Sequence, residues 1–134
     1  MERLRDARPR DEPTAVVLAA LDPAQPYGAA LPWPARESGG TPKRQAGAQV
    51  VLVDGGPALY LERGGKGLLM LAEPGDERLA VAASALARWV TSDRRRRVRI
   101  ERVDGAPTAE SPEVRDALLE AGFREDLRGL SLRA

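Results

Sequence analysis

The sequence predicts an α+β domain with a mainly antiparallel, barrel-like sheet and two helices. Short runs rich in branched apolar residues alternate with glycine-containing turns, and two stretches repeat their apolar residues at helical spacing. The chain of 134 residues has the length of a single domain. Residues 1–12 alternate charges with almost no apolar content, so we expect a disordered leader or linker there and one folded domain over residues 13–134.

Three strands are predicted in the middle of the chain. Residues 48–53, 58–63 and 67–71 are short runs rich in branched apolar residues, and the segments between them, residues 54–57 and 64–66, have the composition of tight turns. The pattern is typical of an antiparallel meander.

The other elements follow from spacing and from end signals. Residues 14–21 form a short apolar run, which fits either a strand or one to two helical turns. Helices are predicted over residues 77–91 and over residues 111–122, the latter from a Ser-Pro start, with the hydroxyl available as a cap, to a glycine stop. Alternating apolar and polar residues predict strands near residues 98–101 and 130–133.

Residues 22–42 contain five prolines and two neighbouring glycines, which exclude a helix and a central strand. We therefore expect an extended arm on the domain surface, held by Tyr27, Leu31 and Trp33. Tyr27 and Trp33 are interpreted as docking residues that anchor the arm, in preference to platforms on which nucleic-acid bases stack.

Composition excludes several kinds of chemistry. The chain has no cysteine and no histidine, so disulfides, thiolate nucleophiles, imidazole bases and the usual zinc sites are excluded, and no metal ligand is predicted. No apolar run approaches the roughly 20 residues that span a bilayer. We expect a cytoplasmic protein with no membrane partner.

The net charge of +1 conceals an excess of arginine, because only Lys43 and Lys66 of the 21 basic residues are lysines. Arginine suits phosphate, but a GC-rich genome also enriches arginine, so composition alone does not establish nucleic-acid binding. The densest cluster lies after the first helix and continues along a predicted strand. It is either a phosphate-binding face or a solvated helix end that favours cations. The candidate nucleic-acid-binding residues are Arg63, Lys66, Arg94, Arg95, Arg96, Arg97 and Arg99.

The glycines around Lys66 do not make a phosphate loop. Tyr60 occupies the position of the first motif glycine, and Gly67 occupies that of the required serine or threonine. This segment therefore predicts a hairpin turn without nucleotide binding.

The acidic residues have simple structural roles as turn formers or cross-strand ion pairs, so no catalytic residue is predicted. The acids considered are Asp54, Glu62, Glu101, Asp104, Glu125 and Asp126.

Four blocks of sequence carry a family resemblance: DPAQPYGAALPWP at residues 22–34, QAGAQVVLVDGGPALYLERGGKGLLML at 45–71, RIERVDG at 99–105, and SPEVRDALLEAGFREDLRGLSLRA at 111–134. In this order and spacing they resemble the C-terminal segment of Lhr-type (large helicase-related) ATP-dependent DNA helicases, over about residues 16–134. The layout is also similar to the β-barrel domain of the AlkZ family of DNA glycosylases.

The resemblance implies a longer parent protein with two helicase lobes and winged-helix domains preceding this one. That parent would be an ATP-hydrolysing 3′–5′ helicase acting in DNA repair on single-stranded DNA or RNA:DNA hybrids. The ATPase motifs are absent from this chain, so ATP and Mg²⁺ belong to the parent lobes and no cofactor is expected here. The glutamine-rich catalytic motif of the AlkZ family is absent too, so no glycosylase residue is carried over.

Three hypotheses follow. The first is an accessory domain that binds nucleic acid or docks within a DNA-repair helicase. The second is a DNA glycosylase-like module acting on damaged bases. The third is a structural domain for docking or homo-oligomerisation.

Overall fold

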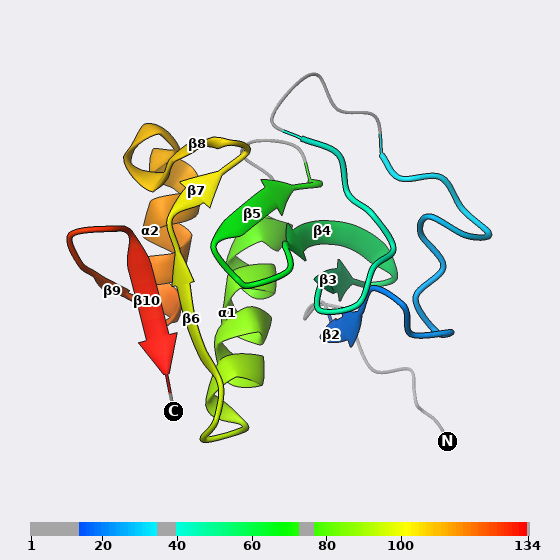
Figure 1. The fold of residues 1–134 in the computed structure, drawn as a ribbon, viewed down its shortest axis with the longest axis horizontal. Helices are drawn as coiled ribbons and strands as arrows, with labels where there is room; N and C mark the ends of the chain where they lie inside the picture. The colour runs from blue at the N-terminus through cyan, green and yellow to red at the C-terminus, as the bar shows by residue number, and fades with distance from the viewer. Residues whose placement is uncertain (1–13, 35–39, 73–76, 134) are drawn as a thin grey trace.

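The computed structural model describes residues 14–34, 40–72 and 77–133 (Figure 1). The predicted leader, residues 1–12, lies outside these ranges. In chain order the elements are β2 (Ala15–Ala19), β3 (Gln49–Val53), β4 (Gly56–Leu61), β5 (Gly67–Met70), α1 (Arg78–Thr91), β6 (Arg97–Ile100), β7 (Arg102–Val103), β8 (Ala106–Pro107), the 3₁₀ turn η1 (Thr108–Glu110), α2 (Pro112–Ala121), β9 (Arg124–Glu125) and β10 (Leu130–Arg133).

The strands form two sheets, which confirms the α+β class. One has six strands in the order β2-β3-β4-β5-β7-β8 and is antiparallel except where β5 pairs with β7. The other has the antiparallel order β6-β10-β9. The expected barrel is not found: no closed barrel forms within the described ranges. The physical reason is that the chain changes sheet at Glu101, between β6 and β7, so the strand predicted near residues 98–101 does not extend the meander.

Local turn chemistry explains two of the hairpins. Asp54 and Gly55 both have positive φ angles (51° and 84°), as do Asp104 and Gly105 (53° and 82°). Each pair forms the two-residue loop of an antiparallel hairpin. Positive φ at both loop positions is the geometry that Asp-Gly favours and that matches strand twist. The turns predicted at these dipeptides are therefore confirmed.

The strand alternative for residues 14–21 is the correct one, because β2 pairs antiparallel with β3. The start of α2 differs from prediction in one respect. Ser111 occupies the cap position, but its side chain makes no capping hydrogen bond, and the fixed φ of Pro112 begins the helix. Gly122, with a φ of 118°, ends it, and Phe123 returns to the core at 3% exposure. In the described part of the chain, neither α-helix is both long and apolar enough to cross a membrane.

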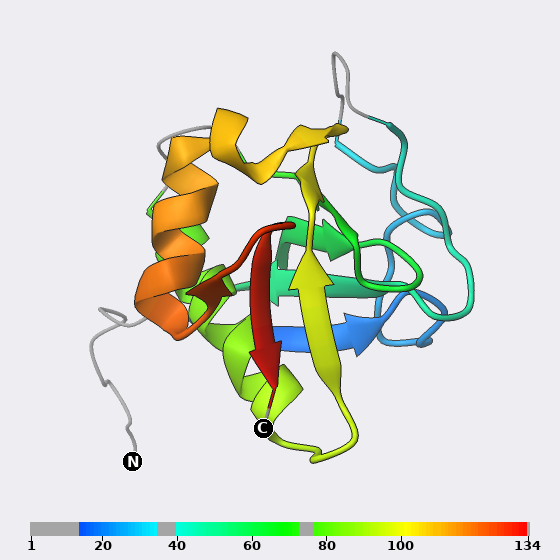
Figure 2. The ribbon, with the colours of Figure 1, turned by 60° about the vertical axis from the view of Figure 1, so that its left-hand side comes forward.

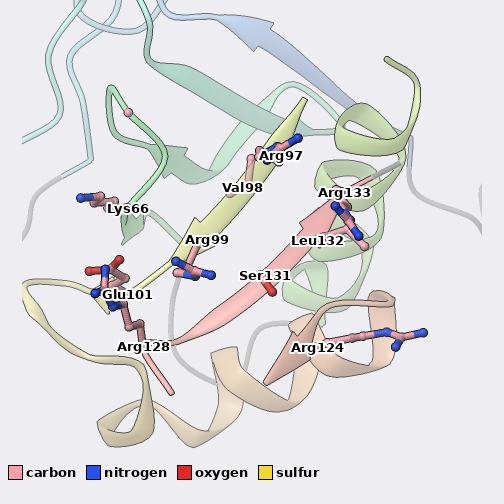
Figure 3. Close-up of a pocket in the computed structure, with 11 residues that line it drawn as sticks. Lys66, Arg97, Val98, Arg99, Glu101, Arg124, Arg128, Ser131, Leu132 and Arg133 are labelled. Atoms are coloured by element: carbon pink, nitrogen blue, oxygen red, sulfur yellow. The ribbon is translucent and has the colours of Figure 1, made fainter. Parts of the chain in front are cut away.

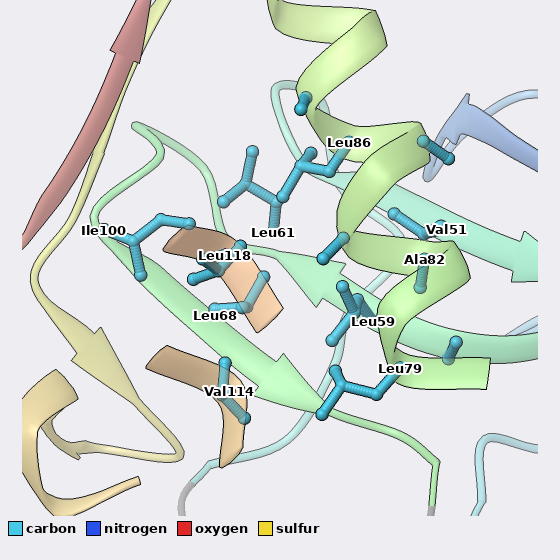
Figure 4. Close-up of a cluster of buried hydrophobic side chains, with 14 of the residues drawn as sticks. Val51, Leu59, Leu61, Leu68, Leu79, Ala82, Leu86, Ile100, Val114 and Leu118 are labelled. Atoms are coloured by element: carbon cyan, nitrogen blue, oxygen red, sulfur yellow. The ribbon is translucent and has the colours of Figure 1, made fainter. Parts of the chain in front are cut away.

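The main core lies around α1. This helix contacts β2, β3 and β4 on one side and β10 and α2 on the other, as Figures 1 and 2 show. Leu79 and Leu86 of α1 pack in one cluster with Leu59, Leu68 and Ile100 (Figure 4). Full burial of a large apolar side chain stabilises a fold by about 1.5–3 kcal/mol. The sheet β6-β10-β9 therefore has one face fixed against this core and leaves the other face for polar residues.

The Pro-rich arm covers the opposite face of the six-stranded sheet. Its described residues contain turns and one isolated bridge, Tyr27 to Leu31. The Trp33 ring lies 6.1 Å from the Tyr27 ring and meets Tyr60 of β4 edge-on at 5.7 Å. Tyr27 and Trp33 pack against a second buried cluster on this face, to which Tyr60 belongs. Tyr27 and Trp33 thus contact their own domain, while docking to another domain stays a prediction.

Candidate nucleic-acid interface

The outer face of β6-β10-β9 and the β4–β5 turn together line an open groove of about 900 Å³ (Figure 3). Arg99 and Ser131 lie in its middle, with Lys66 and Arg124 on opposite sides. Six cations and one acid are among its lining residues. We call this surface the basic groove, and its charged residues are Lys66, Arg97, Arg99, Arg124, Arg128, Arg133 and Glu101.

Strand register places four of these arginines on one face: Arg97, Arg99, Arg124 and Arg133. Arg97 of β6 lies opposite Arg133 of β10, and Arg99 lies opposite Ser131, which in turn lies opposite Arg124 of β9. Alternate strand residues point to opposite faces, and residues two apart on a strand are about 6.5–7 Å apart. The result is a grid of guanidinium groups on strands whose intervening residues face the core.

The Arg97–Arg133 pair is unusual because like charges directly opposite each other destabilise a sheet. Within the ranges that the structure describes, neither side chain has an ion pair. The formal net charge of the whole chain is only +1, whereas six cations and one acid are among the lining residues of the groove, so positive charge is in local excess on this face. Local conflicts of this kind are expected at functional or strained sites.

The β4–β5 turn is fixed against the groove. The Lys66 carbonyl accepts hydrogen bonds from the Glu101 N–H at 2.8 Å and from the Arg102 N–H at 3.1 Å. These bonds tie the turn to the junction where the chain leaves β6. Lys66 therefore reaches the groove from a different sheet, at a position that the backbone fixes.

The β9–β10 turn is held by Asp126. Its carboxylate accepts hydrogen bonds from the backbone N–H groups of Arg128 (2.8 Å) and Gly129 (3.0 Å) and from Arg99 Nε (3.1 Å). The Arg128 N–H bond is the largest cause that lowers the pKa of Asp126, although desolvation partly opposes it, and Gly129 and Arg99 add to the lowering. The carboxylate is therefore ionised near neutral pH, where it orients Arg99 and holds the turn.

The predicted cluster of four arginines does not act as one unit. Arg96 Nη1 donates to the Trp89 carbonyl at 2.8 Å and to Ser92 Oγ at 2.9 Å, and its guanidinium lies 4.2 Å from the centre of the Trp89 ring. Arg95 pairs with Asp93 at 3.4 Å. These contacts complete the C-terminal end of α1, where cations are favoured. Arg96 therefore follows the alternative of a helix end that favours cations. The alternative of a phosphate-binding face remains for the arginines on β6.

Of the seven candidate residues, the structure brings three to the basic groove: Lys66, Arg97 and Arg99. Arg63, Arg94, Arg95 and Arg96 are not among its lining residues.

Sequence reasoning missed Arg124, Arg128 and Arg133. Arg133 had a usable signal, because the alternation of leucines with Ser131 and Arg133 places both polar residues on one strand face. Arg124 and Arg128 enter the groove only through the pairing of β9 with β10, which the sequence did not predict.

Four of the six acids considered have structural partners in the described residues: Asp54, Asp104, Glu125 and, as described above, Asp126. The cross-strand ion pairs expected for Glu62 and Glu101 are not found among these residues. Asp54 accepts from the Thr14 N–H at 2.9 Å, and Asp104 accepts from the Met70 N–H at 3.0 Å. Glu125 pairs with Arg115 of α2 at 2.8 Å. Glu101 is the acid that lines the basic groove. The described segments contain no group of three or more acids placed to hold a metal ion.

Comparison with known proteins identifies two relatives. No protein-family model matches the chain. The chain is 47% identical over 130 residues to "Lhr helicase/ probable uracil glycosylase" of Mycolicibacterium smegmatis, a match that covers 92% of this chain and 9% of that protein. It is 36% identical over 134 residues to "Lhr helicase/uracil glycosylase" of Escherichia coli K12, covering 97% of this chain and again 9% of the relative. The chain therefore spans about 9% of the length of these relatives.

Proposed function

Since the chain is homologous to a segment of about 130 residues in Lhr helicase/uracil glycosylase proteins, we propose that it is a nucleic-acid-binding accessory domain of such a helicase. In this proposal the basic groove holds the sugar-phosphate backbone of the nucleic acid. The observation that carries it is the grid of arginines around Arg97 and Arg133, two like charges opposed across a sheet without an ion pair in the described residues.

Guanidinium forks match phosphate geometry and bind it in two-point fashion. None of the described lining residues is aromatic, so the groove offers no platform on which bases could stack. Contacts to the backbone position a nucleic acid without reading its sequence. Binding in the groove is therefore expected to depend strongly on salt and only weakly on sequence.

The motor would lie outside this chain. ATP, Mg²⁺ and 3′–5′ translocation belong in this proposal to helicase lobes elsewhere in the longer protein, and winged-helix domains would precede the present one. The domain's contribution to DNA repair would be to retain single-stranded DNA or an RNA:DNA hybrid during unwinding.

Fluorescence anisotropy of a labelled single strand tests the proposal directly. We expect micromolar or weaker binding at low salt. Four to five phosphate contacts predict a log–log salt slope of about −3 to −3.5 for a single strand. Changing Arg97 and Arg124 to Ala should lower the size of the slope by about 1.4, whereas changing Arg88 and Arg95, which lie outside the groove, should not. Absence of binding at low salt, or binding that the groove change leaves intact, would contradict the proposal.

A second candidate function is removal of uracil from DNA, which is named in both relatives. Glycosylases extrude the target base into a pocket, and a carboxylate can activate the attacking water. Glu101 lies in the basic groove, near cations that would hold the DNA. The open groove and its lack of aromatic rings make this candidate weaker. Release of uracil from a labelled oligonucleotide, abolished by Glu101→Gln with unchanged DNA affinity, would support it, and absence of release would exclude it for this chain.

A further inference from the structure

Leu127 is the most exposed large apolar side chain in the described residues. Its relative exposure is 105%, whereas Leu21, the next most exposed, is at 49%. Single exposed leucines are common on protein surfaces and by themselves indicate nothing. The position of Leu127, in the turn between β9 and β10, is what distinguishes it.

That turn is rigidly built. The Asp126 N–H donates to the Gly129 carbonyl at 2.8 Å, and the Asp126 carboxylate accepts from both residues that follow Leu127. The carboxylate also receives Arg99 Nε at 3.1 Å, which ties the turn to β6. A side chain at Gly129 would collide with the Ile100 backbone, so the base of the turn is packed against β6. Leu127 is therefore held in water by a fixed turn.

The surroundings of this turn are cationic. Arg128, the next residue, lines the basic groove, and so does Arg99, which bonds to the same turn. Phosphates of a bound nucleic acid would bind to these guanidinium groups. The bases are then the part of the ligand that offers an apolar surface within reach of the turn. Apolar side chains of some DNA-binding proteins, leucine among them, insert between base steps and unstack them, at a cost of a few kcal/mol per step.

We propose that Leu127 is an apolar wedge that contacts and unstacks bases of the nucleic acid held in the basic groove. This inference rests on the proposed function, because the groove must hold the backbone before Leu127 can reach a base. It assigns the two parts of the ligand to different residues: the arginines bind phosphates and Leu127 contacts bases. The unstacking cost offsets the gain from base contact, so the wedge changes the conformation of the nucleic acid more than the affinity.

The test uses a partial duplex that carries 2-aminopurine, a base whose fluorescence rises when it unstacks, at successive positions around the junction. Binding of the unchanged protein should raise the fluorescence at one or two positions. Leu127→Ala should remove most of that rise while changing Kd by less than about threefold and leaving the salt slope unaltered, because all cations remain. Leu127→Met should keep the signal, and Leu21→Ala, a matched change in the turn that follows β2, should behave as the unchanged protein.

The outcomes separate the two proposals. If anisotropy shows salt-dependent binding but the 2-aminopurine fluorescence does not rise, the proposal that Leu127 is a wedge is wrong. The same holds if Leu127→Ala keeps the full rise in fluorescence. In both cases the proposal that the groove binds the backbone is retained. If no nucleic acid binds at low salt, both proposals fail. Because Leu127 is fully exposed, Leu127→Ala should leave the melting temperature unchanged, so loss of signal through unfolding is detectable.

Discussion

Replacing Arg133 by Glu separates binding from stability, because it should move the two in opposite directions. Arg133 lies directly opposite Arg97, and the change converts a like-charged cross-strand pair into an oppositely charged one. Cross-strand charge pairs of this kind contribute about 0.2–1 kcal/mol. The free energy of unfolding should therefore rise by about that amount, which corresponds to an increase of roughly 1–4 °C in Tm for a domain of this size.

Affinity for single-stranded DNA should fall in the same variant. One lost phosphate contact removes about 0.7 from the log–log salt slope, which is about fivefold in Kd at 0.1 M salt. Repulsion between the new carboxylate and phosphate adds to this loss. Anisotropy titrations at four or five salt concentrations give both Kd and slope, and a thermal melt by circular dichroism gives the stability.

The matched control is Arg88→Glu, which makes the same charge change on α1, away from the groove. It should alter Kd by less than about twofold through the general field of the protein. An Arg133→Glu variant that loses both stability and affinity would show that Arg133 supports the fold rather than the ligand. Unchanged affinity together with a raised Tm would show that the groove does not contact DNA.

Three further changes test the structural assignments. Arg96→Ala removes the guanidinium from the Trp89 ring and two hydrogen bonds at the end of α1, so urea titration should show a loss of about 1–2 kcal/mol with an unaltered DNA salt slope. Trp33→Ala removes the edge contact with Tyr60 and should cost about 2 kcal/mol in thermal melts, part of which Trp33→Phe should restore. The pKa of Asp126 is lowered below its ordinary value of 3.8, mainly by a backbone hydrogen bond in its own turn. The contribution of the ionised Asp126 to stability is therefore complete above pH 3.8 and is lost as pH falls through the folded-state pKa. The amide NMR shifts of the turn should titrate below about pH 3.8, and they should not do so in Asp126→Asn.

Elements whose conformation is set by residues close together in the sequence were predictable. The Asp-Gly dipeptides at 54–55 and 104–105 adopt the turn that their chemistry favours, and the helix predicted over residues 77–91 begins at Arg78 and ends at Thr91. In both cases the deciding interactions lie within a few residues, where turn propensity and apolar spacing act directly. The arm also follows local rules, because its prolines exclude regular structure.

Features that depend on pairing between distant segments were not predictable. The prediction of a barrel was wrong because the chain changes sheet at Glu101. After that change β7 pairs parallel to β5, a contact between residues 67–68 and 102–103 that no local pattern specifies. The prediction of the residues in the basic groove was wrong in part for the same reason. Four consecutive arginines suggested one surface, but only Arg97 lies on β6. Arg96 is bound by the end of α1, and Arg95 pairs with Asp93. Register across β6, β10 and β9 then recruits arginines from positions far along the chain.

Stability and charge are carried by alternate residues of the same strands. In β6, Val98 and Ile100 are buried, at 7% and 0% exposure, while the arginines on either side of Val98 face outward. Each opposed pair of like charges costs at most about 1 kcal/mol, whereas each large side chain buried beneath contributes about 1.5–3 kcal/mol. Val98, Ile100 and Leu130 on the inner face therefore outweigh the repulsion between Arg97 and Arg133 on the outer face. Because α1 and α2 anchor the inner face of this sheet, the outer face can carry Arg97 and Arg133, neither of which has an ion pair in the described residues. In the proposed function these two groups bind phosphate.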